Sequence, residues 1–213
     1  MQLACQSGSP DIVRLLLSMG ASTTATTRSG KTALSIAVTY GSLKAAEAIL
    51  QHDPEQAKIP DLGGSTPLMW ACENAGSNVR TGVQLVELLL KQGVDVNQED
   101  PRGQTAFDRL LQTANGNAKV AQLLLMAGAR IIHQVDKKRP MTSLMVAALN
   151  GHKEIVKELL DKCNVDATVK TEHGTTARDF ADTNGHTAIV DTIDERIKII
   201  IDASLNEENP GGL

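Results

Sequence analysis

The stretch that decides the fold covers residues 142–160 and reads Thr142-Ser143-Leu144-Met145-Val146-Ala147-Ala148-Leu149-Asn150-Gly151-His152-Lys153-Glu154-Ile155-Val156-Lys157-Glu158-Leu159-Leu160. Thr142 can cap a helix, because its hydroxyl accepts a free backbone N–H at the helix start. Apolar residues then recur at helical spacing, and Gly151 is typical of a helix end because glycine adopts the left-handed conformation without a Cβ clash. A second helix follows with one apolar stripe. Two helices this short cannot close a core alone, so each pair needs a copy of itself on either side.

Copies of this unit are present along the chain. The capping threonine recurs as Thr32, Thr66, Thr105, Thr142 and Thr176, at intervals of 34, 39, 37 and 34 residues. A further copy at the N-terminus starts inside its first helix, at Ala4-Cys5-Gln6-Ser7-Gly8. This pattern resembles the ankyrin repeat, whose period is about 33 residues. The matching signatures are Thr-Pro-Leu-Met at 66–69, Asn-Gly-His at 150–152 and 184–186, and Gly-Val-Asp-Val-Asn at 93–97.

The resemblance implies an all-α fold, an ankyrin-repeat solenoid of antiparallel helix pairs joined by β-hairpin-like loops. We predict a single array over residues 1–205, followed by a polar, flexible tail over 206–213. The repeats are expected at about 1–26, 27–60, 61–99, 100–136, 137–170 and 171–205. Because the first repeat begins inside its first helix, we expect further repeats or another domain upstream. The alternative is an unusual half-repeat cap.

Composition and charge exclude several functional classes. The formal net charge of −4 argues against a dedicated binder of nucleic acid or acidic membranes. No apolar run approaches the roughly 20 residues that span a bilayer, so no membrane insertion is expected. Three cysteines, far apart and odd in number, do not form a disulfide framework, which indicates a reducing compartment. We therefore expect a cytoplasmic or nuclear protein, monomeric, with another protein or a peptide segment as its partner.

The sequence contains no pattern typical of an enzyme or cofactor site. It has no glycine-rich phosphate loop, no Gly-x-Ser-x-Gly elbow and no cysteine or histidine pattern of metal spacing. His152 and His186 follow turn glycines and are expected to be structural, and Cys5 and Cys72 to be packing residues. We predict no enzyme activity, no cofactor and no metal. One modification motif is present: Asn97 resembles the acceptor of an asparaginyl hydroxylase, although such an asparagine also has a simple structural role in its loop.

Several departures from the repeat are specific to this chain. Residues 75–80 form an insertion between the paired helices of the third repeat, expected to be a polar surface loop with or without a function of its own. Arg109 stands where a leucine is usual in the family, next to Leu110 and Leu111. Trp70 holds the same place in its repeat, where core packing is favoured over partner binding. Residues 137–139 form a basic loop, either simply solvated or facing an acidic partner segment.

By resemblance, a partner binds the concave face, which is lined by hairpin tips and by the residues after the small pair of each first helix. The set carried over position by position is Arg28, Lys31, Thr39, Tyr40, Leu62, Glu73, Asn74, Arg102, Gln112, Lys138, Arg139, Leu149, Asn150 and His173. Tyr40 and Leu149 are the members expected to expose apolar surface.

Two functions follow from these patterns. The first is a non-catalytic module that docks a partner on the concave face, within a larger intracellular protein. The second is an architectural spacer that packs against neighbouring domains of the same, possibly enzymatic, protein. Partner binding predicts exposed apolar surface at Tyr40 and Leu149, and a spacer predicts it at the truncated start and at Ile199.

Overall fold

The structure, a computed structural model, describes residues 1–76, 78–132 and 140–207. All secondary-structure elements in these ranges are helices, which confirms the predicted all-α class. None of them is long and apolar enough to cross a membrane. The chain divides into two compact units, Met1–Arg130 and Ile131–Leu213, so a single continuous array stays a prediction.

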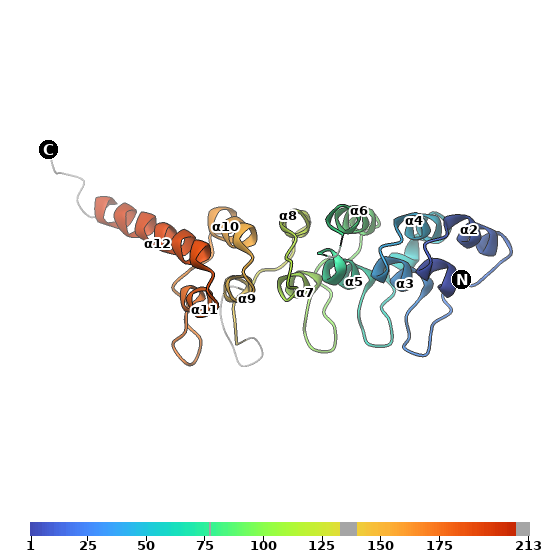
Figure 1. Cartoon of the computed structure of the whole chain (residues 1–213), viewed down its shortest axis with the longest axis horizontal. Helices are drawn as coiled ribbons and strands as arrows, with labels where there is room; N and C mark the ends of the chain where they lie inside the picture. Colours follow the sequence, from blue (N-terminus) through green and yellow to red (C-terminus); the bar gives the residue numbers. More distant parts are fainter. Residues whose placement is uncertain (77, 133–139, 208–213) are drawn as a thin grey trace. The chain divides into compact units, whose positions relative to one another are not determined.

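The first unit contains four helix pairs. Within it the first helices of the pairs lie in one row, the second helices lie in a parallel row, and long loops project beyond the first row (Figure 1). The helices are α1 (Gln2–Gln6), α2 (Pro10–Ser18), α3 (Ala33–Thr39), α4 (Leu43–His52), α5 (Pro67–Asn74), α6 (Val79–Leu90), α7 (Ala106–Leu111) and α8 (Ala118–Met126), with a short 3-10 helix η1 (Pro54–Lys58) after α4.

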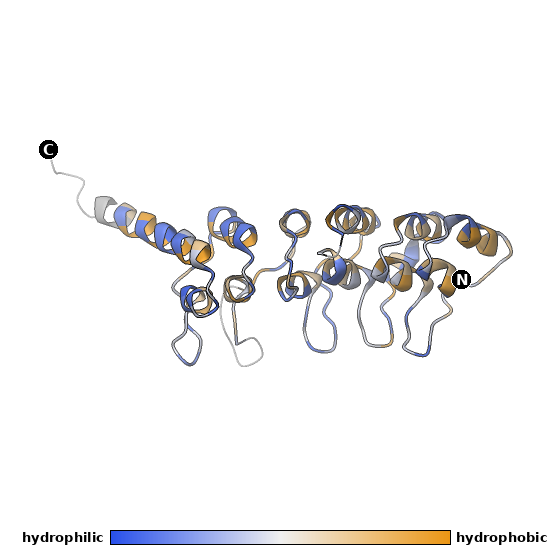
Figure 2. Ribbon diagram, in the orientation of Figure 1, coloured by the Kyte–Doolittle hydropathy of each residue, from blue (hydrophilic) through white to orange (hydrophobic). Residues whose placement is uncertain are grey.

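The second unit contains two pairs of the same kind. They are α9 (Ser143–Leu149) with α10 (Lys153–Lys162), and α11 (Ala177–Thr183) with α12 (Thr187–Glu207). As expected, α12 runs far past the length of the other second helices, at 21 residues. Hydrophilic and hydrophobic residues alternate along it (Figure 2). It extends through Glu207, and the rest of the tail predicted over 206–213 lies outside the described residues.

The predicted caps and small core residues are confirmed. Thr32, Thr66, Thr105, Thr142 and Thr176 are each the N-cap of a first helix and accept a backbone N–H three residues on. The alanines on these helices, such as Ala37 and Ala147, are fully buried. Because they lack bulk, the short helices approach closely enough for each pair to complete the core of the next.

The loops before the first helices have hairpin-like hydrogen bonds. The backbone N–H groups of Thr27, Asp61, Asp100 and Thr171 each donate to the carbonyl four residues on, with a glycine of positive φ in between. Gly30 is the tightest of these, because a Cβ there would lie 2.2 Å from Cγ of Leu62 on the next hairpin. Neighbouring hairpins of the first unit therefore pack directly on one another.

Two irregularities interrupt the repeat in the first unit. After α4, Pro54 starts η1 in place of a glycine turn, and Asp53 accepts hydrogen bonds from Thr23 and Gln56. The insertion at 75–80 is only partly a loop, because α6 begins at Val79 and Ala75 is fully buried. A Cβ at Gly82 would lie 2.6 Å from Cα of Ala75, so the absence of a side chain there lets the inserted turn fold back onto α6.

At helical spacing, the sequence places the apolar residues of α12 on one stripe and Ile199 on the other side; the stripe consists of Ile189, Val190, Ile193, Ile197, Ile200 and Ile201. The stripe is correct for Ile189, Val190 and Ile193, which are buried. It is wrong for Ile200 and Ile201, which are about as exposed as Ile199. The reason lies in length: α11 has seven residues and contacts only the first part of a helix three times as long.

Candidate functional site

A large hollow in the first unit opens between three successive hairpins and the first helices that follow two of them. Its volume is about 940 Å³. Its lining comes from the hairpins before α3, α5 and α7, and from the C-terminal parts of α5 and α7 with the turn after α7. The lining includes the side chains of Lys31, Ser65, Trp70, Glu73, Arg102 and Arg109.

Two buried aspartates organise the floor of this hollow in the same way. Asp61 accepts the backbone N–H groups of Gly63 and Ser65 through Oδ1, which closes its hairpin, and accepts Trp70 Nε1–H through Oδ2 at 3.0 Å. Asp100 closes the next hairpin through Oδ1, and its Oδ2 accepts Arg109 Nη2–H at 2.8 Å. One carboxylate thus holds both a hairpin and the side chain that faces the hollow.

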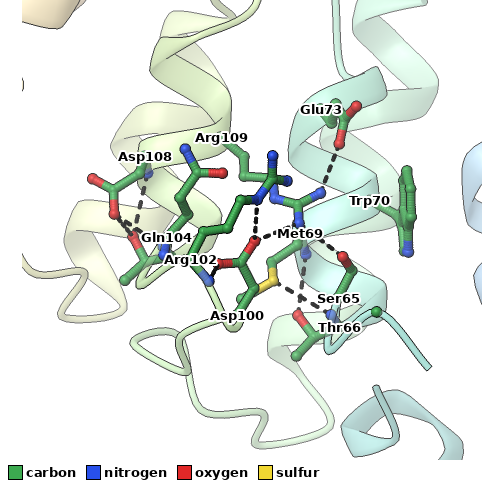
Figure 3. A network of polar contacts seen from close by, with 12 residues as sticks. Ser65, Thr66, Met69, Trp70, Glu73, Asp100, Arg102, Gln104, Asp108 and Arg109 are labelled. Atoms are coloured by element: carbon green, nitrogen blue, oxygen red, sulfur yellow. Dashed lines mark hydrogen bonds and ion pairs between the residues drawn. The ribbon is translucent and has the colours of Figure 1, made fainter. Parts of the chain in front are cut away.

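Arg109 joins two repeats (Figure 3). Its guanidinium donates to Glu73 at 2.9 Å and to Ser65 Oγ at 2.7 Å in the preceding repeat, besides Asp100 in its own. Its side chain is 7% exposed and that of Asp100 is 1% exposed, so this ion pair is withdrawn from water. Breaking such a pair by removing one partner typically costs about 3–5 kcal/mol.

Burial disfavours the charged forms of Asp100 and Arg109, but their hydrogen bonds favour the charged forms more strongly. Burial tends to raise the pKa of Asp100, but the N–H groups of Gln104, Arg109 and Arg102 hold that pKa below its usual value. Burial likewise tends to lower the pKa of Arg109, whereas hydrogen bonds to Asp100 and Glu73 raise it above its usual value. Both groups are therefore charged at neutral pH.

Trp70 lies beside this network and below a lysine. Lys31 Nζ, from the preceding repeat, lies 3.6 Å from the centroid of the Trp70 ring, and Arg109 Cζ lies 5.6 Å from it. A cation over an aromatic face contributes about 0.5–1 kcal/mol at exposed sites. Trp70 is half-buried and lines the hollow, so it packs only partly in the core, and whether it contacts a partner stays a prediction. Asp61 holds it there, because its bond to the indole N–H keeps the ring at the surface of the hollow.

A smaller groove of about 280 Å³ lies between the C-terminal ends of α3 and α5 and the helix α6. Tyr40, which is 57% exposed, lines it together with Asn74, Thr81 and Leu85. Tyr40 is thus exposed as predicted. Leu149, in the second unit, is half-buried and not exposed as expected, and its carbonyl contacts His186 Nε2 at 3.2 Å.

The remaining predicted partner-binding residues lie in different parts of the chain. Lys31, Glu73, Arg102 and Gln112 line the large hollow, and Arg28 and Leu62 are exposed on hairpins of the same unit. Thr39 and Asn74 line the smaller groove, while Asn150 and His173 belong to the second unit. Lys138 and Arg139 lie outside the described residues. Whether any of these residues touches a partner stays a prediction.

Asn74 and Asn150, predicted at the binding face, have a structural bond as well, and Asn184 has the same one. The side-chain N–H group of each donates to the carbonyl four residues back, at the end of the first helix of its repeat. The carbonyls of Val146 and Phe180 also accept the backbone N–H of Asn150 and Asn184, so the side chain adds a second bond at these helix ends. The sequence signal was the recurrence of asparagine eight residues after the capping threonine.

Asn97 bridges two repeats. Its side chain donates to the carbonyl of Gly128 at 2.9 Å and accepts the N–H of Arg130 at 2.7 Å. These bonds agree with the structural role considered for this residue. Hydroxylation of Asn97 stays a prediction.

Among the described residues, no three His, Cys, Asp or Glu side chains are grouped so that they could hold a metal ion. Cys5 and Cys72 are buried as expected, and burial raises the pKa of the Cys5 thiol to about 11 and that of Cys72 well above its usual value. Both thiols are therefore protonated at neutral pH and poor nucleophiles.

Comparison with known proteins identifies the family. A family model described as "Ankyrin repeats (3 copies)" matches residues 1–100, 55–134 and 110–202. The chain is 32% identical over 121 residues, 56% of its length, to a probable E3 ubiquitin-protein ligase of Oryza sativa subsp. japonica. It is 30% identical over 210 residues, 95% of its length, to the transient receptor potential cation channel subfamily A member 1 of Homo sapiens. It is 29% identical over 181 residues, 83% of its length, to the B-cell lymphoma 3 protein homolog of Mus musculus.

The chain spans 23%, 17% and 38% of the lengths of these three relatives. The helix pairs, the capping threonines and the hairpins described above recur over the same residues that the family model matches. The chain belongs to the ankyrin-repeat family.

Proposed function

We propose that this chain docks a partner protein or peptide on the concave face of its first unit, in the hollow around Trp70. Ankyrin repeats are protein-interaction modules and are not themselves catalytic. The relatives that share this part of the sequence differ widely in name, and the chain spans less than two fifths of each. We therefore assign docking to the shared repeats. Any further activity of the longer proteins would belong to their other regions.

The observation that carries this proposal is the placement of the chain's sole tryptophan. Trp70 is held at the surface of the hollow by Asp61, between cations from its own neighbours in the preceding and following repeats. Tryptophan, tyrosine and arginine are the residues that most often dominate binding energy at interfaces. Maintaining a large aromatic ring in a polar hollow has no benefit for the core, whereas it offers area to a partner.

A photo-crosslinking experiment tests this proposal. A photoreactive amino acid replaces Gln112, in the hollow, or Gln84, which is exposed on α6 in the row of second helices. Crosslinked partners are identified by mass spectrometry from cells expressing each variant. We expect adducts from position 112 that are lost when Trp70→Ala is added, and none from position 84. Equal adducts from both positions, or adducts that survive Trp70→Ala, would contradict docking in the hollow.

A specific observation also favours the second candidate, an architectural spacer. Apolar side chains are exposed on α1, on α2 and just after it: Leu3, Ile12, Leu15 and Met19. Together they make an apolar surface of the kind that marks an interaction site. A photoreactive residue at Leu15 in the protein as cells make it would then crosslink to the same chain. Crosslinks only to other proteins would contradict the spacer role.

We also place this function in the cytoplasm or nucleus. The support is the cysteines, since Cys5, Cys72 and Cys163 are all free thiols. Fractionation of cells that express a tagged chain tests this assignment.

A further inference from the structure

We propose that the hollow selects an acidic partner segment, with one carboxylate lying beside Trp70 between Lys31 and Arg102. This inference rests on the proposed function, because it names the chemistry of the partner that the hollow takes. Some polar atoms of the hollow already have partners, and others are accessible.

The acidic groups of the hollow already have hydrogen-bond or ion-pair partners within the chain. Asp61 and Asp100 are both engaged internally: each accepts two backbone N–H groups through Oδ1 and a side-chain N–H through Oδ2. Both aspartates are buried. The side chain of Glu73 is 44% exposed, but its charge is matched by Arg109 at 2.9 Å. A basic partner side chain would therefore have to displace an existing ion pair.

Two basic groups of the hollow, Arg102 and Lys31, are accessible. The side chain of Arg102 is 72% exposed, and its Nε lies a loose 3.6 Å from Asp100 Oδ2. Lys31 is half-buried, and its Nζ has one long hydrogen bond of 3.5 Å to Thr39. Below them, Arg109 Nε is buried without a hydrogen-bond partner among the described residues. The hollow is thus short of acceptors, which a carboxylate supplies.

The hairpin tips extend the same preference along the array. Arg28 lies on the first hairpin, Leu62 on the second and Arg102 on the third, and Leu62 is 78% exposed. Helices in contact pack about 8–10 Å apart, and an extended peptide advances about 3.3 Å per residue. An extended partner segment therefore meets a new hairpin about every three residues. The order of tips predicts a segment with an acidic residue, an apolar residue and an acidic residue at that spacing.

Selection from a random 12-residue peptide library tests this proposal. The library is panned against the wild-type chain, against Lys31→Glu/Arg102→Glu, and against Lys91→Glu/Lys119→Glu. The last pair is the matched control, because both lysines are exposed on or next to second helices and the net charge changes equally. Circular dichroism checks that each variant folds, and emission from Trp70 reports whether a selected peptide enters the hollow.

We expect wild-type selection to enrich Glu and Asp about three residues apart around an apolar residue. These peptides should bind Lys31→Glu/Arg102→Glu about tenfold more weakly or worse, because attraction becomes repulsion, and bind the control variant about as well as wild type. Selected peptides that change Trp70 emission but show no acidic bias would overturn this inference and leave docking in the hollow intact. Peptides that leave Trp70 emission unchanged, or the absence of any enriched peptide, would overturn both.

Discussion

Asp100 and Arg109 lie nine residues apart in their repeat and are joined by a 2.8 Å hydrogen bond, and Asp61 and Trp70 lie nine residues apart in the preceding repeat and are joined by a 3.0 Å bond. The equivalent aspartates use their second oxygen for the side chain that faces the hollow. One repeat places a cation there and the other an aromatic ring. The scaffold of the site is thus repeated, while its chemistry changes from repeat to repeat.

Removing one partner of the buried Arg109–Asp100 ion pair should destabilise the chain more than removing both. Arg109→Ala leaves Asp100 Oδ2 without its donor in a buried place, so we expect a loss of about 3–5 kcal/mol in the free energy of unfolding. The double variant Arg109→Leu/Asp100→Asn removes both charges and retains an oxygen for the hairpin, so it should recover most of that loss. Urea unfolding measures both, and a loss below about 1 kcal/mol for Arg109→Ala would contradict the role of the network.

The contribution of Asp100 should depend on pH in a definite direction. Because its pKa in the folded chain lies below the usual value of about 3.9, the unfolded chain binds the proton first as pH falls. The stability that this carboxylate adds is therefore present above about pH 5 and lost as pH falls through the folded pKa. We expect Asp100→Asn to be less stable than wild type at neutral pH, with a difference that narrows in acid. Urea unfolding at a series of pH values checks this, and a constant difference would contradict it.

Alanine substitutions at Gly30 and Gly93 distinguish the cost of backbone strain from the cost of close packing. Both have positive φ, at 77° and 66°, but a Cβ at Gly93 meets nothing within 4 Å. Gly93→Ala should therefore cost about 1–2 kcal/mol from the left-handed conformation alone. Gly30→Ala should cost clearly more, because its Cβ would also lie 2.5 Å from the backbone nitrogen of Leu62. Equal losses of stability for the two variants in thermal unfolding would mean that the hairpin that carries Leu62 moves aside freely.

Asn97 should matter for stability whether or not it is modified. Asn97→Ala removes two hydrogen bonds between successive repeats, and we expect a loss of about 1–3 kcal/mol. Asn115→Ala, at an exposed position in the turn before α8, is the control and should change stability by less than about 0.5 kcal/mol. Chemical denaturation measures both. Mass spectrometry of the peptide that contains Asn97, purified from cells, tests the separate prediction that it gains one oxygen.

Lys31 should shield Trp70 from water. Because Lys31 Nζ lies 3.6 Å above the ring, Lys31→Ala should shift the emission of this sole tryptophan to longer wavelength and cost at most about 1 kcal/mol. Lys91→Ala, at an exposed lysine after α6, is the control and should leave the emission unchanged. A fluorescence spectrum of each folded variant gives the answer, and an unchanged spectrum for Lys31→Ala would place the lysine away from the ring in solution.

The sequence by itself determined the fold class, the repeats and their caps. Each of these depends on residues close in the chain: the hydroxyl of Thr142 reaches an N–H only three residues away, and Gly151 ends a helix through its own backbone. Because the unit repeats along the chain, each helix pair can pack against the next copy of itself. The sequence also pointed to Tyr40, Lys31 and Arg102 through their places in the repeat, because equivalent places in a repeat face the same side.

Only the tertiary structure decided what lies in the hollow. Trp70 and Arg109 occupy a place that leucine usually fills, so the sequence favours core packing for Trp70 and indicates no bonding partner for Arg109. Their positions instead depend on Asp61 and Asp100, on Glu73 from another repeat, and on Lys31 stacked above the ring. Charges so far apart in the chain stabilise one another only when folding removes them from water at the same place, and no local pattern records that.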